Sequence, residues 1–244
     1  MARPIAIVFA LGNEAEGFVS HLSNTDIIRD GDCTTTTGIV AGIQVIVVSS
    51  GPGAKQAAAA TSHLISRHQP SWVISAGFSG GLVNTVRPGD IVVADSITDE
   101  QRNLLTIDLH LHENNQSTGL HVGRVLTVDH VVVSAEIKQQ LGEIHHALTV
   151  DLESFAVAQV CTGEKVKFLA TRVVFDSVEQ TLPDEIKILL AQDTRAARWG
   201  AVAGSVIRRP SSVQDLWKLR ENAINSSNRL GQFLVDIIPQ LGQT

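Results

Sequence analysis

Residues 147–177 constrain the fold more than any other part of the chain, and they read ALTVDLESFAVAQVCTGEKVKFLATRVVFDS. They predict a strand over Ala147–Val150, a helix from about Ser154 to Cys161 that ends at the following Thr-Gly, and a strand over Phe168–Phe175. The second strand is an apolar, β-branched run broken only by Arg172, as expected for a strand covered on both faces of a parallel sheet. The order strand, helix, strand therefore predicts an α/β fold.

An acidic side chain follows each of these two strands. Asp151, Leu152 and Glu153 follow the first strand, and Asp176 ends the second. Ligands of open α/β sheets bind at the carboxyl ends of the strands. We therefore expect Glu153 and Asp176 to border one crevice.

A third candidate acid, Glu14, stands where the first strand, Pro4–Ala10, turns into a helix. The positive end of the helix dipole favours its ionised form there. Acids in a first helical turn are also common capping residues, so the position alone assigns Glu14 no role.

The remaining elements follow from shorter patterns. A hairpin is expected over Asp26–Gly38 with Thr34–Thr37 as an edge strand, followed by buried strands over Gln44–Ser49 and Ser71–Ala76. A strand is expected over Arg124–Val128. The last third is expected to be helical, over Ile186–Ala191, Ala196–Ile207 and Val213–Ile238.

Composition excludes several classes of protein. The chain has 244 residues, 43% hydrophobic and 18% charged, which suits a globular protein with a sizeable core. Its net charge of −6 argues against a nucleic-acid-binding surface, and no apolar run approaches the roughly 18 residues of a membrane span. The apolar N-terminus is followed at once by Glu14 and Glu16 without a cleavage pattern, so we expect a buried strand and a cytoplasmic protein. Without repeats or a linker, residues 1–244 are expected to form a single domain.

Cysteines and histidines give no metal signal. Cys33 and Cys161 are isolated and lack the spacing of metal ligands, so we expect thiols. His110, His112 and His121 lie in a polar stretch without an acid at ligand spacing. A loop or edge strand is favoured there, and no metal or cofactor is predicted.

Two strings carry a family resemblance. VDLES…RVVFDS resembles the signature V-[DE]-M-E…R-x-[IV]-S-D of the nucleoside phosphorylase/nucleosidase superfamily, and SAGFSGGL…GDIVV resembles its T-G-S-A-G-G-L…G-D-I-V-V string. Relatives of methylthioadenosine/S-adenosylhomocysteine nucleosidase look most similar, and the resemblance spans about Ile5 to Asp176. It implies a three-layer α/β/α fold with a mixed, mainly parallel central sheet.

The resemblance also implies catalytic roles. Asp176 would be the general acid at the purine N7, with a pKa raised by burial, and Glu153 would bind the ribose hydroxyls. The string IAIVFALGNE is similar to the opening strand–G-A-M-E-E-E of these nucleosidases, which places Glu14 on the acid that activates water. Gly12 and Asn13 replace the other two acids.

Further substrate contacts are implied by the same motifs. Phe78 takes the place of a serine that faces the sugar, and whether its ring faces the ligand or the core stays open. Val131 and Val132 match the residues that contact the purine, without an aromatic ring. The other implied contacts are Gly51 of the SGPG turn, Gly77, Ser79 and Leu152.

The function that the resemblance implies is a purine nucleosidase that hydrolyses a 5′-substituted adenosine and releases adenine. The substrate would be of the methylthioadenosine/S-adenosylhomocysteine type or a bulky 5′-alkyl adenosine such as adenosylhopane, because the chain also looks like the hopanoid-associated branch. A homodimer is expected, as is common in the family. No nucleic-acid partner is expected.

Three alternatives remain. Phosphorylases of the superfamily carry arginines at the turn where this chain has LGNEAE, and Arg87, beside Pro88, is expected on the surface, so phosphate-dependent cleavage is the less favoured reaction. An inactive nucleoside-binding module is suggested by Phe78 and Val131. An NAD-dependent enzyme would rest on SGPG, which lacks the third glycine of a dinucleotide fingerprint.

Overall fold

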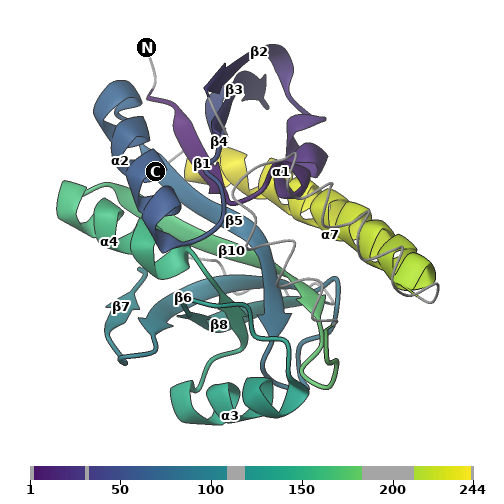
Figure 1. The fold of residues 1–244 in the computed structure, drawn as a ribbon. Coiled ribbons are helices and arrows are strands. Elements are labelled where there is room, and N and C mark those ends of the chain that lie inside the picture. The colour runs from purple at the N-terminus through teal and green to yellow at the C-terminus, as the bar shows by residue number, and fades with distance from the viewer. Residues whose placement is uncertain (1–2, 31–32, 109–118, 183–211, 243–244) are drawn as a thin grey trace.

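The computed structural model describes residues 3–30, 33–108, 119–182 and 212–242, which form one mixed β-sheet flanked by helices (Figure 1). The strands are β1 Ile5–Phe9, β2 Ser23–Asp30, β3 Cys33–Val40, β4 Ile43–Ser49, β5 Trp72–Gly81, β6 Ile91–Asp99, β7 Leu104–Thr106, β8 Leu120–Thr127, β9 Thr149–Asp151 and β10 Lys167–Asp176. The helices are α1 Gly12–Val19, α2 Ala54–His68, α3 Ala135–His145, α4 Ser154–Glu164 and α7 Ser212–Leu241.

Strand β5 organises the sheet. It runs parallel to β1 and β10 and antiparallel to β9 near its end. On one side β4 continues the parallel order, and the β2–β3 hairpin adds antiparallel strands. On the other side the path β10, β6, β8, β9 returns to β5, so these five strands close into a ring. The mixed α/β sheet predicted from the sequence is confirmed, and the ring is an addition to that prediction.

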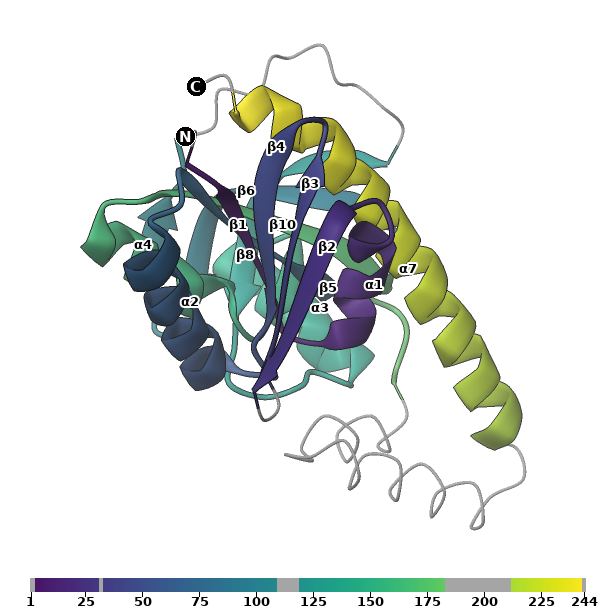
Figure 2. The same cartoon turned by 90° about the horizontal axis from the view of Figure 1, so that it is seen from above.

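Alternating side chains of β1 separate two helical layers. Ile5, Ile7 and Phe9 are buried beneath α1 and α7, whereas Ala6 and Val8 are buried beneath α2 and α4. Figure 2 shows these helix pairs on opposite faces of the sheet. An apolar strand that is covered on both faces is what a parallel core requires.

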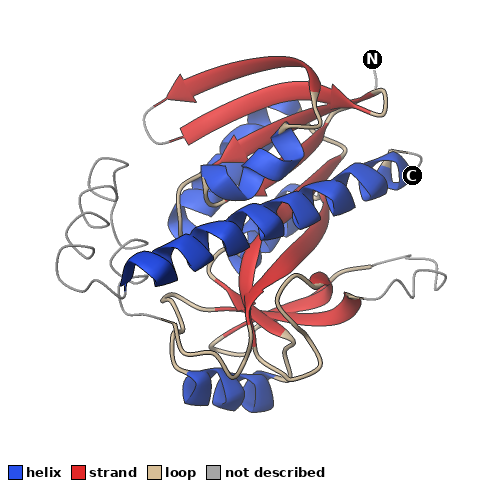
Figure 3. Cartoon of the chain, turned by 90° about the vertical axis from the view of Figure 1, so that its right-hand side faces the viewer, coloured by secondary structure: helices blue, strands red, loops and turns tan. Residues whose placement is uncertain are grey.

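The long helix α7 crosses α1 at very close range (Figure 3). A Cβ atom placed on Gly17 would lie 2.2 Å from the Ser227 carbonyl oxygen, and one on Gly231 would lie 2.4 Å from the Gly17 carbonyl carbon. Ser227 also accepts a hydrogen bond from the Gly17 N–H at 2.8 Å and donates one to the Glu14 carbonyl at 3.1 Å. The C-terminal helix therefore fixes the position of the helix that carries Glu14.

Several predicted boundaries need correction. Strand β5 continues through Gly81 instead of ending at Ala76, because β10 and β9 supply partners along the glycine string. Thr34–Thr37 lies inside the sheet, since β3 pairs with both β2 and β4 and β2 is the edge strand. Helix α4 runs through Glu164, where Lys165 adopts a left-handed conformation.

The predictions for the C-terminal third of the chain can be compared with the structure only in part. Val213–Ile238 is helical within α7, as predicted. The helices predicted over Ile186–Ala191 and Ala196–Ile207, together with His110 and His112, lie outside the described residues. Among the helices that the structure describes, none is long and apolar enough to cross a membrane.

Candidate active site

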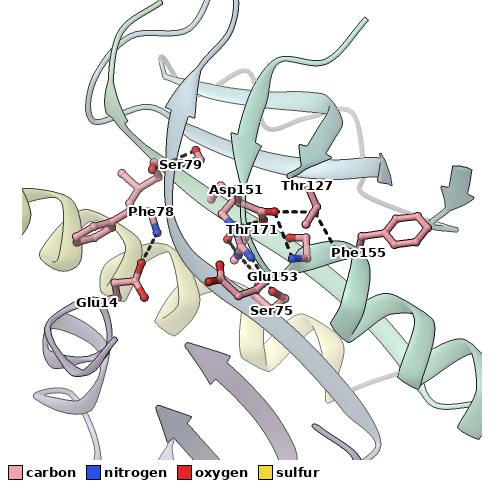
Figure 4. A network of polar contacts seen from close by, with 12 residues as sticks. Glu14, Ser75, Phe78, Ser79, Thr127, Asp151, Glu153, Phe155 and Thr171 are labelled. Atoms are coloured by element: carbon pink, nitrogen blue, oxygen red, sulfur yellow. Dashed lines mark hydrogen bonds and ion pairs between the residues drawn. The ribbon is translucent and has the colours of Figure 1, made fainter. Parts of the chain in front are cut away.

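Glu14 lies in the first turn of α1 with its carboxylate against the middle of β5. Its Oε2 accepts a hydrogen bond from the Leu11 N–H at 2.8 Å, and its Oε1 accepts one from the Phe78 N–H at 2.9 Å (Figure 4). Burial raises the pKa of Glu14 above its usual value, although these two amides and Arg172 act in the opposite direction. The amides at the helix start favour the ionised form, as expected, and the burial that the sequence did not reveal outweighs them in the net direction of the pKa.

Glu153 stands between β9 and α4 and reaches the glycine turn that precedes α2. The Gly53 N–H donates to its Oε1 at 2.7 Å. Burial, followed by the neighbouring acids Asp151 and Glu14, raises the pKa of Glu153 to about 8. The structure thus brings Glu14 close enough to Glu153 to raise its pKa. The SGPG turn binds the Glu153 carboxylate through the Gly53 N–H.

Asp176 ends β10 and is 4% exposed. Burial raises its pKa to about 6, and the ammonium of Lys138 limits the increase. The raised pKa that was expected for Asp176 is confirmed. Lys138 of α3, which is fully buried, donates a hydrogen bond to Asp176 Oδ2.

A buried ion pair between Arg172 and Asp151 lies next to Glu153. Arg172 Nε donates to Asp151 Oδ2 at 2.6 Å, and the guanidinium also donates to the Ser75 carbonyl at 2.9 Å and the Ser75 hydroxyl at 2.7 Å. Asp151 Oδ1 in turn accepts a hydrogen bond from Thr127 at 2.7 Å. The pair crosslinks β5, β8, β9 and β10 next to Glu153 (Figure 4).

Glu14 and Asp176 both contact β5, but the acids do not meet for the reason expected. Strand β10 is parallel to β5 and β9 is antiparallel to it, so the carboxyl ends of β9 and β10 do not point the same way. A Cβ atom on Gly77 would lie 3.0 Å from Glu14 Oε1, and one on Gly80 would lie 3.6 Å from both Asp176 carboxylate oxygens. Glu14 and Asp176 therefore contact β5 three residues apart, about 10 Å along a strand.

The ring of Phe78 packs against the core cluster that lies beneath α1 and α7. It stacks on the Phe175 ring with centroids 5.3 Å apart and an interplanar angle of 11°. The side chain is half-buried, while the backbone amide holds Glu14. The contribution of Phe78 to the site that the structure shows is thus its amide, with the ring directed toward the core.

The other predicted contacts occupy mixed positions. The Ser79 hydroxyl is buried and donates to the Val173 carbonyl at 3.4 Å, and Val132 is buried in a core cluster with Leu152 packed against it. Val131 is half-buried. Gly51 has φ +87° and donates its N–H to the Ala10 carbonyl at 2.9 Å, so it joins the two loops beside Glu14.

Sequence reasoning missed Lys138, Arg172 and Asp151 as parts of the site. Arg172 carried a usable signal, because a charge inside an apolar strand requires a buried partner. Lys138 carried none, since it lies on a helix that belongs to no recognised motif. The structure alone joins it to Asp176.

Other polar groups among the described residues form separate clusters. Glu100, Asp129 and His130 bring potential metal-ligand atoms within 4.8 Å of one another, and Asp129 and His130 are exposed. His121 is hydrogen-bonded to Asp90 at 2.9 Å. A groove of about 380 Å³ between α1 and the β2–β4 strands is lined by Gly12, Glu16, Arg29, Thr36 and Ser49 among others, and none of the three acids lines it.

Comparisons with known proteins find related sequences and related folds. The sequence profile of the Phosphorylase superfamily matches residues 4–115. The 5′-methylthioadenosine/S-adenosylhomocysteine nucleosidase of Bacillus pumilus is 28% identical, and the match covers 70% of this chain and 85% of that protein. The nucleosidase of the same name from Staphylococcus epidermidis is 29% identical, and the match covers 70% of this chain and 86% of that protein.

Solved structures show the same fold. A Helicobacter pylori nucleosidase with 5′-methylthioadenosine in its active site matches with a TM-score of 0.75 at 19% identity, over 98% of this chain and all of that one. A Streptococcus pneumoniae nucleosidase with a transition-state inhibitor matches with a TM-score of 0.71 at 20% identity, over 95% and 96% of the two chains. The resemblance of this chain to the phosphorylase superfamily is thereby confirmed, and methylthioadenosine/S-adenosylhomocysteine nucleosidases are the relatives that it resembles.

Proposed function

We propose that this protein is a purine nucleosidase that hydrolyses the N-glycosidic bond of a 5′-substituted adenosine and releases adenine. The observation that carries the proposal is a set of three buried or half-buried acids, of which Glu14 and Asp176 contact β5 and Glu153 interacts with Glu14. The named activity of the relatives at 28–29% identity supports the same reaction.

Each acid has an environment that suits one role. Cleavage builds negative charge on the departing base, and Asp176, with a pKa near 6, is protonated often enough to donate to N7. The attack of water on the sugar needs a base that takes a proton from the water. Glu14 has its pKa raised by burial, which makes its ionised form a stronger base.

Glu153 is assigned to the ribose hydroxyls. Its Oε1 accepts a hydrogen bond from the Gly53 N–H, and burial raises its pKa to about 8, which favours the protonated form at neutral pH. Hydroxyl hydrogen bonds and the positive charge that develops on the sugar would both favour its ionised form.

The 5′ substituent is proposed as a class. A methylthio or homocysteinyl group follows the named substrates of the relatives. A bulky 5′-alkyl group is the second possibility and rests on the sequence resemblance to the hopanoid-associated branch. Comparison of turnover of methylthioadenosine with that of long 5′-alkyl adenosines separates the two, and faster turnover of methylthioadenosine removes the second.

Phosphate-dependent cleavage has one observation in its favour. The Arg29 side chain lines the groove that also contains Gly12 and Ser49, near the turn that leads to Glu14. Glu16 lines the same groove and would repel phosphate. Hydrolysis is therefore preferred, and omission of phosphate from the assay tests the choice.

The expected homodimer is also part of the proposal. Helix α3 turns Ile137 and Ile144 toward solvent, 46% and 50% exposed, and these residues are one heptad apart on one face. Light scattering in solution should give twice the mass of one chain. A single-chain mass would remove this part of the proposal.

The decisive experiment measures adenine release from methylthioadenosine in phosphate-free buffer, with wild type and Asp176→Asn compared. We expect release by wild type and a loss on the order of 10²–10⁴-fold in the variant, because an amide cannot supply the proton. Release that requires phosphate and yields a sugar phosphate would contradict hydrolysis. Tight adenine binding without turnover of any nucleoside would instead indicate a binding module.

A further inference from the structure

Helix α3 buries polar side chains and exposes apolar ones, which is the opposite of an ordinary surface helix. Lys138, Gly142 and His145, at spacings of four and three residues, face the interior. Ile137 and Ile144 face outward. A lysine is buried in this way only when its ammonium finds partners that replace water.

Those partners are all at the end of β10. Lys138 Nζ donates to Asp176 Oδ2, to the Ser177 carbonyl at 3.0 Å and to the Gln180 carbonyl at 2.7 Å. An ammonium has three N–H donors, and a neutral amine has two. The three acceptors therefore match the charged form of the lysine.

The same contacts hold the backbone that follows Asp176. The Ser177 and Gln180 carbonyls belong to the turn after β10, and the Leu182 N–H donates to the Val133 carbonyl just before α3 at 2.9 Å. Lys138 thus fixes both the carboxylate and the turn that carries it.

The charges near the site fall into two groups. Lys138 is the charged group that acts on Asp176 in the described part of the chain. Asp151, Glu14 and Arg172 act on Glu153, and Arg172 acts on Glu14. His145, the other buried titratable group on α3, responds to Arg102, Glu100, Asp99 and Arg124.

From this geometry we infer that Lys138 is a positioning residue for Asp176, which occupies carboxylate oxygen Oδ2 and leaves Oδ1 to carry the proton to the departing base. The inference rests on the proposed function and deepens it. The Asp176 O–H bond breaks, N7 gains the proton, and the electrons of the C1′–N9 bond move into the base. Water adds its oxygen to C1′ and gives its proton to Glu14, and the Lys138 ammonium stabilises the Asp176 carboxylate until solvent reprotonates it.

The test is the pH profile of kcat/KM for wild type, Lys138→Met and the control Gln140→Met, which alters an exposed side chain of the same helix. A general acid loses activity as pH rises through its pKa, so the wild-type rate should fall above about pH 6. Without the ammonium, the fall should move up by about one pH unit or more. The plateau kcat should drop on the order of tenfold or more, because Asp176 is no longer held.

A purely structural lysine gives a different result. Its loss would lower kcat without moving the pH at which activity falls, and that result overturns the inference. Lys138→Gln serves if Lys138→Met does not fold, since it keeps hydrogen bonding and removes the charge. The same upward shift is expected for it.

A measurement without turnover separates this inference from the proposed function. The ¹³C NMR titration of the Asp176 carboxyl, assigned by comparison with Asp176→Asn, should move to higher pH in Lys138→Met. An unchanged titration overturns the role of Lys138 even in an active enzyme. A wild type that cleaves no nucleoside overturns the proposed function, while the titration still decides whether Lys138 controls Asp176.

Discussion

At the residue scale, backbone atoms determine the position of the Glu14 carboxylate. Its carboxylate rests on the Leu11 and Phe78 amides, and the Gly77 Cα lies directly beneath it. A glycine at this position permits the carboxylate to approach the strand closely. The side chain that we propose to activate water is thus positioned by backbone atoms.

Substitution Gly77→Ala tests this arrangement. The added Cβ would lie 3.0 Å from Glu14 Oε1 and 3.3 Å from its Cδ, so the carboxylate must shift by a few tenths of an ångström. We expect kcat for adenine release to fall by on the order of tenfold, because small misplacements of reacting groups are costly. Thermal unfolding should change little. An unchanged kcat would show that Glu14 does not need this position.

At the element scale, the contact between α1 and α7 joins residues more than two hundred positions apart. Gly17 and Gly231 allow the backbones of the two helices to touch. The Ser227 hydroxyl accepts a hydrogen bond from one α1 amide and donates one to an α1 carbonyl. Helix α7 therefore fixes the position of Glu14 although it supplies none of the three acids.

Gly17→Ala should destabilise the protein by about 3 kcal/mol or more, because the new methyl group overlaps the Ser227 carbonyl and backbone atoms cannot move aside. Urea unfolding measures the loss. Gly163→Ala in α4 is the matched control, since a Cβ there meets nothing within 4 Å. It should be neutral or stabilising by up to about 1 kcal/mol. Equal effects of the two substitutions would argue against the close crossing.

At the scale of the whole molecule, the fold places acids from α1, from the turn between β9 and α4, and from the end of β10 in partly desolvated positions. Burial raises the pKa of Glu14, Glu153 and Asp176 together. The folded state therefore binds protons that the unfolded chain releases, and its stability must depend on pH.

The free energy of unfolding should fall as pH rises from about 4.5 to about 8. In this window Glu153 is protonated when folded and ionised when unfolded, so the stabilisation that is complete below its unfolded pKa is lost as pH passes its folded pKa. The loss from Glu153 should be roughly 2–4 kcal/mol, less than the full shift implies because the residue is half-buried. Glu153→Gln should flatten the urea-unfolding profile across this range. A profile as steep as that of wild type would contradict the assignment.

The sequence by itself determined the α/β class, the C-terminal helix and the acids near the carboxyl ends of β9 and β10, and its family resemblance implied the mixed sheet. These features follow from local information: apolar periodicity, glycine turns and short motifs that survive in a single chain. The raised pKa of Asp176 also followed, because an acid that ends an apolar strand is placed in a poorly solvated position.

The tertiary structure alone decided which groups meet. The antiparallel return of β9 places Glu153 beside Glu14, and the ring of strands extends β5 through its glycines. Lys138 was beyond sequence reasoning, because hydrophobic periodicity would turn Ile137 and Ile144 inward. A buried ion pair with Asp176 and a backbone contact at Gly142, where a Cβ would lie 2.5 Å from the Leu82 carbonyl oxygen, turn the helix the other way. Such pairings join distant segments, and their free energy depends on desolvation and geometry that only the folded chain defines.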